Sequence, residues 1–182
     1  GYVFSIWALI YLLLIAFVAY QFFSRHNEEI YNNIIGIWFF ISCLLNAAWI
    51  FAWHFEFFFL SLIIMLALLA VLIIIYSRLH ANRDFLTAGT QLLVYLPFSI
   101  YLAWISVATI ANTAIFLTYI QWSGWGISPV SWTVIMLAVA TVLAISVSLL
   151  HRDLFFVLVF IWAFIGIAIK NFDILPINYA VW

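Results

Sequence analysis

Long apolar runs separated by short polar segments divide this chain into helices that can cross a membrane. A helix of about 20 apolar residues spans the hydrocarbon core of a bilayer, and runs of that length recur along the sequence. We expect five such helices, at residues 2–23, 32–53, 55–76, 90–119 and 130–150. A sixth is expected at residues 154–169, and the tail beyond it is either an interfacial segment or the start of a seventh span. The pattern predicts an all-α protein, a polytopic transmembrane helix bundle.

Polar loops are expected between these helices, at residues 24–29, 77–84, 121–129 and 151–153. The second and third runs almost adjoin around His54 and Glu56, so we expect them to form a tightly connected antiparallel pair. The HRD triplet at residues 151–153 has no kinase context around it and is interpreted as a loop.

The fourth run is longer than a bilayer requires and carries an unusual column of residues. Because of its length, this helix should tilt, bend near Pro97 or project beyond the membrane. Spacings of three and four residues place one set of side chains on a single helix face, namely Pro97, Tyr101, Trp104, Ala108 and Asn112. A face directed only at lipid needs no amide, whereas a face directed into the bundle can use these residues as the wall and polar tip of a pocket.

The composition excludes several functional classes. Only 6% of the residues are charged, against about a quarter in a soluble domain, so no basic patch for nucleic acid can form. The single cysteine, Cys43, lies in an apolar run, and an intrachain disulfide is therefore impossible. We expect no buried acidic residue, which argues against a transporter driven by intramembrane carboxylates. The four histidines lack metal-ligand spacing and no nucleophile–base pair is visible, so neither a metal site nor a catalytic site is expected.

The loop charges predict the orientation of the bundle. If the spans alternate in direction, Arg25, Arg78, Arg83 and Arg152 lie on one side of the membrane and Lys170 on the other. By the positive-inside rule, the arginine-bearing loops are cytoplasmic and the N-terminus is outside. In this orientation most of the ten tryptophans fall in the outer half of the bundle.

Two interpretations of these outer polar and aromatic residues stay open. An aromatic belt at the interface would account for the tryptophans at interface depth, which are Trp53, Trp122, Trp125 and Trp132. It accounts poorly for Trp49 and Trp104, because both lie several residues inside apolar runs. Asn46 and Asn112 are either hydrogen-bonded glue between the second and fourth spans or contacts to a ligand, and the two roles can coexist.

Three segments carry motifs in a recognisable order. The segment GYVFSIWALIY contains Tyr2, Val3, Phe4, Trp7 and Tyr11. The segment LLNAAWIFAW contains Asn46, Trp49, Phe51 and Trp53, and PFSIYLAWISVATIAN contains the column described above. In these motifs, in their order and in its N-terminus-out topology, the chain resembles the TspO/translocator protein family, also called tryptophan-rich sensory proteins.

The chain also departs from the family pattern. Ser5 and Ile6 stand where the family's first helix usually has Gly-Pro, and Tyr101 is shifted from the usual Pro-Tyr pair. The family ends after its fifth helix, so the resemblance covers roughly residues 1–150. We therefore divide the chain into a TspO-like five-helix transmembrane bundle, residues 1–150, and an additional transmembrane helix and tail, residues 151–182.

The resemblance implies a membrane receptor or binding protein for a planar hydrophobic ligand, such as a porphyrin, another tetrapyrrole or a sterol. The ligand would lie in an aromatic pocket between the first, second and fourth helices. The residues that would bind it are Trp7, Tyr11, Asn46, Trp49, Trp53, Tyr101, Trp104, Ala108 and Asn112. No cofactor is required, although a bound porphyrin or haem is compatible, with His54 near the pocket mouth as a candidate contact.

Other functions stay open alongside the receptor. The chain could be a transporter or exporter of such molecules, or a structural subunit of a membrane complex. An enzymatic role would take the form of light- or oxygen-dependent chemistry on a bound tetrapyrrole. The expected partners are the hydrophobic small molecule and the lipid bilayer, and a homodimer is compatible with the sequence.

Overall fold

The computed structural model describes residues 2–23, 35–83 and 86–182, and every regular element within them is helical. The elements follow the chain as η1 (Tyr2–Ser5), α1 (Ile6–Phe23), α2 (Gly36–His54), α3 (Phe58–Ala81), α4 (Ala88–Thr90), η5 (Gln91–Tyr95), α5 (Leu96–Tyr119), η6 (Gly124–Gly126), α6 (Pro129–His151), α7 (Leu154–Lys170) and α8 (Leu175–Val181). Five helices are long and apolar enough to cross a membrane, and α7 is a shorter apolar helix of 17 residues. The all-α helix-bundle prediction is confirmed.

The helix boundaries follow local chemistry with one clear exception. Three residues connect α2 to α3, as expected from the adjoining runs, and Glu56 takes a left-handed conformation there (φ 59°). Ser128 caps α6 by accepting a hydrogen bond from the backbone N–H of Ser131, next to a proline in the first turn. The loop expected at residues 77–84 is wrong, because α3 continues to Ala81. Its last turn stays helical because Leu79 is fully buried there.

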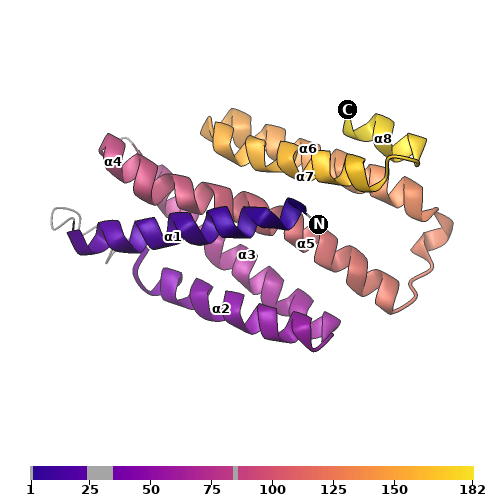
Figure 1. Ribbon diagram of the computed structural model, residues 1–182, viewed down its shortest axis with the longest axis horizontal. Helices are drawn as coiled ribbons and strands as arrows, with labels where there is room; N and C mark the ends of the chain where they lie inside the picture. Colours follow the sequence, from indigo (N-terminus) through magenta and orange to yellow (C-terminus); the bar gives the residue numbers. More distant parts are fainter. Residues whose placement is uncertain (1, 24–34, 84–85) are drawn as a thin grey trace.

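The long helix around which the molecule packs is α5. It contacts α3 on one side and α7 on the other, while α2 lies beyond α3 and α6 lies beyond α7 (Figure 1). The remaining long helix, α1, also packs against α5. As a result, all ten residues from Pro97 to Ser106 are buried, and no other helix has a buried run of this length in the described residues.

A widened π-helical turn precedes Pro97. Residues 91–95 form this turn, and the backbone N–H of Leu96 reaches back five residues to the carbonyl of Gln91. Proline lacks an N–H and its ring collides with the carbonyl four residues earlier, so a regular α-helix is disfavoured at this point. The irregularity expected near Pro97 therefore takes the form of a π-turn, which brings Val94 and Tyr95 into the interior.

Candidate functional site

An aromatic cluster joins α1, α2 and α5, with Trp7 at its centre. The Trp7 ring stacks on Tyr11 and on Trp49, with centroid separations of 5.5 Å and 6.0 Å. It meets Tyr101 and Trp104 of α5 edge to face, at 6.1 Å and 6.3 Å. Aromatic pairs in these geometries contribute about 0.5–1.5 kcal/mol each beyond their area burial. Five of the nine predicted site residues thus belong to one set of touching rings.

Helical spacing explains why these side chains meet. Trp49 and Trp53 are separated by one turn of α2, and their rings stack at 5.8 Å. Asn46 lies one turn before Trp49 on the same face, and its Nδ2 donates a hydrogen bond to the Tyr11 hydroxyl at 3.0 Å. The structure therefore brings seven of the nine predicted residues together, from Trp7 on α1 to Trp104 on α5.

Three polar atoms in this cluster are buried without a hydrogen-bond partner in the described part of the chain. They are Oδ1 of Asn46 and the indole Nε1 atoms of Trp49 and Trp104. An unpaired buried donor or acceptor costs about 1–3 kcal/mol, and buried polar groups in folded proteins are nearly always paired. Two donors and one acceptor in this cluster are therefore open to hydrogen bonds with another molecule, such as water or a ligand.

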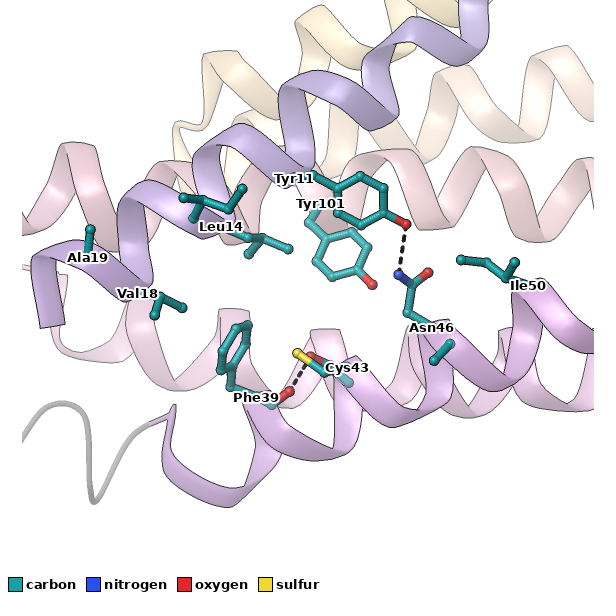
Figure 2. A pocket seen from close by; sticks show the side chains of 12 residues that line it. Tyr11, Leu14, Val18, Ala19, Phe39, Cys43, Asn46, Ile50 and Tyr101 are labelled. Carbon is teal, nitrogen blue, oxygen red and sulfur yellow. Dashed lines mark hydrogen bonds between the residues drawn. The ribbon is translucent and has the colours of Figure 1, made fainter. Parts of the chain in front are cut away.

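A groove of about 660 Å³ opens between α1 and α2, next to the aromatic cluster (Figure 2). Tyr11, Asn46 and Tyr101 form its polar end, and Ser42, further along, is occupied by its hydrogen bond to the carbonyl of Phe39. The remainder of the lining is Leu14, Ile15, Val18, Ala19, Phe39, Cys43, Ala47 and Ile50. The groove exists because α1 packs on α5 and α2 packs on α3, while the hydrogen bond from Asn46 to Tyr11 joins α1 to α2 at its polar end.

The two predicted residues nearest the end of α5 have other surroundings. Asn112 is buried, and its Oδ1 lies 3.2 Å from Ser61 Oγ of α3, whose single proton is shared between this oxygen and the carbonyl of Phe58 at 2.9 Å. The Nδ2 of Asn112 has no partner in the described residues. Ala108 is partly buried against the hydrophobic core. The glue predicted between the second and fourth spans is therefore wrong in its partners: Asn112 connects α5 to α3, and Asn46 connects α2 to α1.

Two further predictions fall outside this cluster. His54 is exposed at the end of α2, where its ring meets Phe55, and it is not among the residues that line the groove. Trp122, Trp125 and Trp132 form a separate group around η6, with centroid separations of 5.2–5.9 Å. The described residues contain no group of three His, Cys, Asp or Glu side chains arranged to hold a metal ion.

A buried carboxylate, which the sequence analysis missed, lies at the other end of the bundle. Asp153 is 2% exposed, so the expectation of no buried acidic residue is wrong. Its Oδ2 accepts hydrogen bonds from Ser99 Oγ at 2.6 Å and from Tyr76 OH at 2.8 Å. Its Oδ1 accepts from the backbone N–H of Phe156, which makes Asp153 the N-cap of α7. An aspartate directly before an apolar helix is an N-cap signal, and this signal in the HRD triplet could have predicted the cap, although not its burial.

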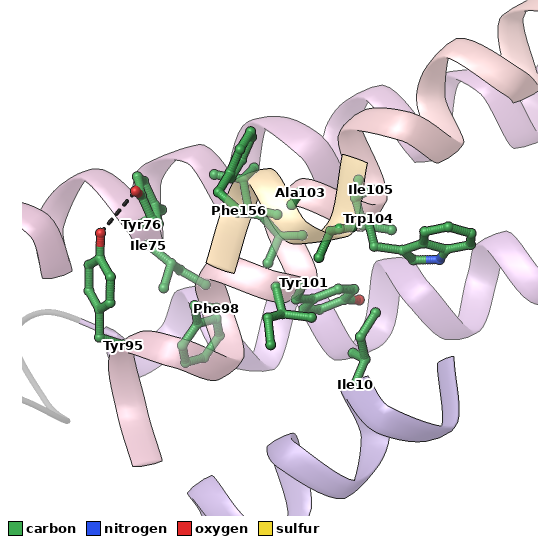
Figure 3. Close-up of a cluster of buried hydrophobic side chains, with 14 of the residues drawn as sticks. Ile10, Ile75, Tyr76, Tyr95, Phe98, Tyr101, Ala103, Trp104, Ile105 and Phe156 are labelled. Atoms are coloured by element: carbon green, nitrogen blue, oxygen red, sulfur yellow. Dashed lines mark hydrogen bonds between the residues drawn. The ribbon is translucent and has the colours of Figure 1, made fainter. Parts of the chain in front are cut away.

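The network around Asp153 continues through tyrosine and histidine. Tyr95, placed in the interior by the π-turn, donates from its hydroxyl to the Tyr76 hydroxyl at 2.9 Å (Figure 3). His80 lies 3.4 Å from the Tyr95 hydroxyl, and its ring meets that of His151 at 4.3 Å. Arg83 closes this group by donating to the carbonyl of His151 at 3.0 Å. The network joins α3, η5, α5 and the connection between α6 and α7.

Comparison with known protein families finds a match over the whole sequence. The family model described as TSPO-like protein matches residues 1–182. This match includes α7 and α8, which lie beyond the residues on which the resemblance in sequence motifs rested. No curated protein and no solved structure matches the chain. The division of the chain at residue 150 stays a prediction, although the two helices that it would separate, α6 and α7, pack directly against each other.

Proposed function

Because this chain belongs to the TSPO-like protein family, we propose that it is a receptor that holds a planar hydrophobic molecule in the groove between α1 and α2. The family and the five long apolar helices identify a multi-pass membrane protein, and the family points to a ligand-binding or transport role. The ligand class that we propose is a porphyrin or another tetrapyrrole, with a sterol as the second candidate.

One observation carries this proposal: Tyr11, Asn46 and Tyr101 line the polar end of the apolar groove and also belong to the aromatic cluster, whose other members, Trp7, Trp49, Trp53 and Trp104, lie behind them. Asn46 lines the groove, and its Oδ1 has no partner among the described residues; the indole N–H of Trp49, one turn away in the adjoining cluster, has none there either. The groove beyond them is almost entirely apolar, as a hydrophobic ligand requires. A flat ligand could pack against the Tyr11 and Tyr101 rings, which line the groove, and pair a polar substituent with Oδ1 of Asn46.

The residues that line the groove suit a porphyrin macrocycle but include no histidine that could contact a haem iron. Aromatic and aliphatic side chains on both walls provide flat apolar surface, and the Tyr101 ring lies at the base of the groove between α1 and α2 (Figure 2). His54 is not part of the lining, so we assign no axial contact to it. The orientation in the membrane, with the arginine-bearing ends of the helices cytoplasmic, stays part of the proposal.

The single cysteine of the chain offers a direct test, because Cys43 lines the groove and is exposed. The protein in lipid nanodiscs is treated with a membrane-permeant maleimide, with and without protoporphyrin. A ligand that fills the groove should slow thiol modification by about tenfold when its concentration is ten times its Kd, by mass action. Quenching of tryptophan fluorescence should saturate over the same concentration range.

A matched control uses the neighbouring position on α2. Leu44 is exposed but does not line the groove, since successive helix positions are rotated by about 100°. In Cys43→Ala/Leu44→Cys the thiol should react at the same rate with and without protoporphyrin. Equal protection at both positions, or none at Cys43, would contradict the assignment of the ligand to the groove.

The alternative of a carrier draws on the side opening of the groove, through which a molecule could enter from the bilayer. A carrier must also release its ligand on the opposite side. Liposomes containing the purified protein separate the two functions: saturable binding without net flux of protoporphyrin supports the receptor, and saturable flux supports the carrier.

A further inference from the structure

Helix α7 packs tightly against the N-terminal turn η1 at one point. Trp162 Nε1 donates a hydrogen bond to the carbonyl oxygen of Val3 at 3.1 Å. One turn further along α7, Gly166 is buried beneath the Val3 side chain. A Cβ atom built at Gly166 would overlap Cγ2 of Val3 and would lie 3.2 Å from both Cβ and Cγ1. The packing of Val3 against α7 therefore requires glycine at position 166.

Val3 is connected to the aromatic cluster through a short stretch of helix. The next residue, Phe4, meets the Trp104 ring edge to face at 6.1 Å. Trp7 follows in the first turn of α1 and contacts both Trp49 and Trp104. Because η1 runs directly into α1, a displacement of Val3 is transmitted to the backbone that carries Trp7.

We propose that α7 positions Trp7 in the aromatic cluster, with Gly166 and Trp162 acting through Val3, and thereby sets the affinity of the groove for its ligand. Neither α7 residue lines the groove, so both are positioning residues, and Trp7 reaches the groove through the rings of Tyr11 and Tyr101 that it contacts. The effect on affinity rests on the proposed function, whereas the position of Trp7 can be measured without any ligand. The additional helix that the motif comparison placed outside the five-helix bundle is thus assigned a part in the site.

Gly166→Ala tests this assignment. Alanine is favoured over glycine in a helix interior, so the substitution does not weaken α7 itself. We expect it to displace η1 and raise the Kd for protoporphyrin about tenfold. Near-ultraviolet circular dichroism from the stacked indoles of Trp7 and Trp49 should fall toward the spectrum of Trp7→Phe, measured as the reference.

A second substitution should reverse both effects. In Val3→Ala/Gly166→Ala the overlapping methyl groups are gone, so the Kd and the spectrum should return to within about twofold of those of Val3→Ala alone. Trp162→Phe, which removes only the donor to Val3, should shift both measurements in the same direction by a smaller amount. Ile169→Ala, at an exposed position of α7, should leave both unchanged.

The outcomes separate the two proposals. If the wild-type protein binds and Gly166→Ala matches it in both measurements, the positioning role is overturned and the proposed function stands. A loss in Gly166→Ala that Val3→Ala does not reverse also overturns it. If the wild-type protein binds no protoporphyrin, the proposed function fails, and the spectra alone decide whether α7 positions Trp7.

Discussion

The aromatic cluster and the Asp153 network differ in whether their buried polar groups are hydrogen-bonded. In the aromatic cluster, Asn46, Trp49 and Trp104 each leave one buried polar atom unpaired within the described residues. In the network, both carboxylate oxygens of Asp153 accept hydrogen bonds from groups on three different segments. A region that satisfies its own polar groups is suited to hold helices together, whereas a region that leaves them unpaired is suited to bind another molecule.

The contrast has one exception, at the edge of the Asp153 network. Nδ1 of His151 is buried without a partner in the described residues, even though its ring contacts His80 and Tyr76. The histidine backbone is nevertheless used, since its carbonyl accepts from Arg83. The unpaired atom belongs to the His151 side chain, and the hydrogen bonds that Asp153 accepts from α3, α5 and α7 are all present.

The largest predicted effect comes from removing the Asp153 carboxylate, the acceptor at the centre of the Asp153 network. Asp153→Ala removes an N-cap, worth about 1 kcal/mol, and leaves the hydroxyls of Tyr76 and Ser99 without their acceptor, at about 1–3 kcal/mol each. We expect the free energy of unfolding to fall by about 3 kcal/mol or more, measured by detergent titration in mixed micelles. Asp173→Ala, at an exposed aspartate, should change it by less than about 0.5 kcal/mol.

Ligand binding by the Asp153→Ala variant tests whether the Asp153 network has a structural role only. No residue of the Asp153 network lines the groove, so the folded fraction of Asp153→Ala should bind protoporphyrin with the wild-type Kd. Unchanged stability, or a large loss of affinity in the folded fraction, would contradict a purely structural network.

The second largest effect is expected in the aromatic cluster. Trp104→Phe removes some ring volume and an N–H that lacks a partner within the described part of the chain. The two contributions to stability oppose each other, so the net change should stay within about 1 kcal/mol. Trp104 does not line the groove, but its ring packs against Trp7 in the aromatic cluster, so we expect the Kd for protoporphyrin to rise about tenfold. Trp132→Phe is the matched control, because its N–H is already bonded to the carbonyl of Gly124 at 2.9 Å. There we expect a loss of about 1 kcal/mol in stability and no change in Kd.

The smallest effect separates the two asparagines. Ser61→Ala and Asn112→Ala should each destabilise the protein by about 0.6–1 kcal/mol, the usual contribution of an interhelical hydrogen bond in a membrane protein. The double variant should lose no more than the larger single loss, since one bond is shared. Asn112→Ala should leave the Kd unchanged, whereas Asn46→Ala should raise it. A higher Kd in Asn112→Ala would show that its unpaired amide reaches the ligand.

The seven residues that meet at the aromatic cluster were predictable because their relation is largely local. Spacings of three and four residues place Asn46, Trp49 and Trp53 on one face of α2 wherever that helix packs. The same reasoning puts Trp7 above Tyr11 on α1. The five long apolar helices, their approximate lengths and the tight turn at Glu56 likewise depend on runs of apolar residues and on nearby sequence, so the sequence alone determined them.

Tertiary structure alone decided which helix faces meet. These helices are apolar on every side, so no amphipathic stripe marks the face that turns inward. The placement of α7 between α5 and α6, the pairing of Asn112 with Ser61 and the contact of Gly166 with Val3 all depend on that choice. So does the burial of Asp153: a polar loop residue by sequence becomes a buried acceptor because Tyr76 and Ser99 arrive beside it from two other helices.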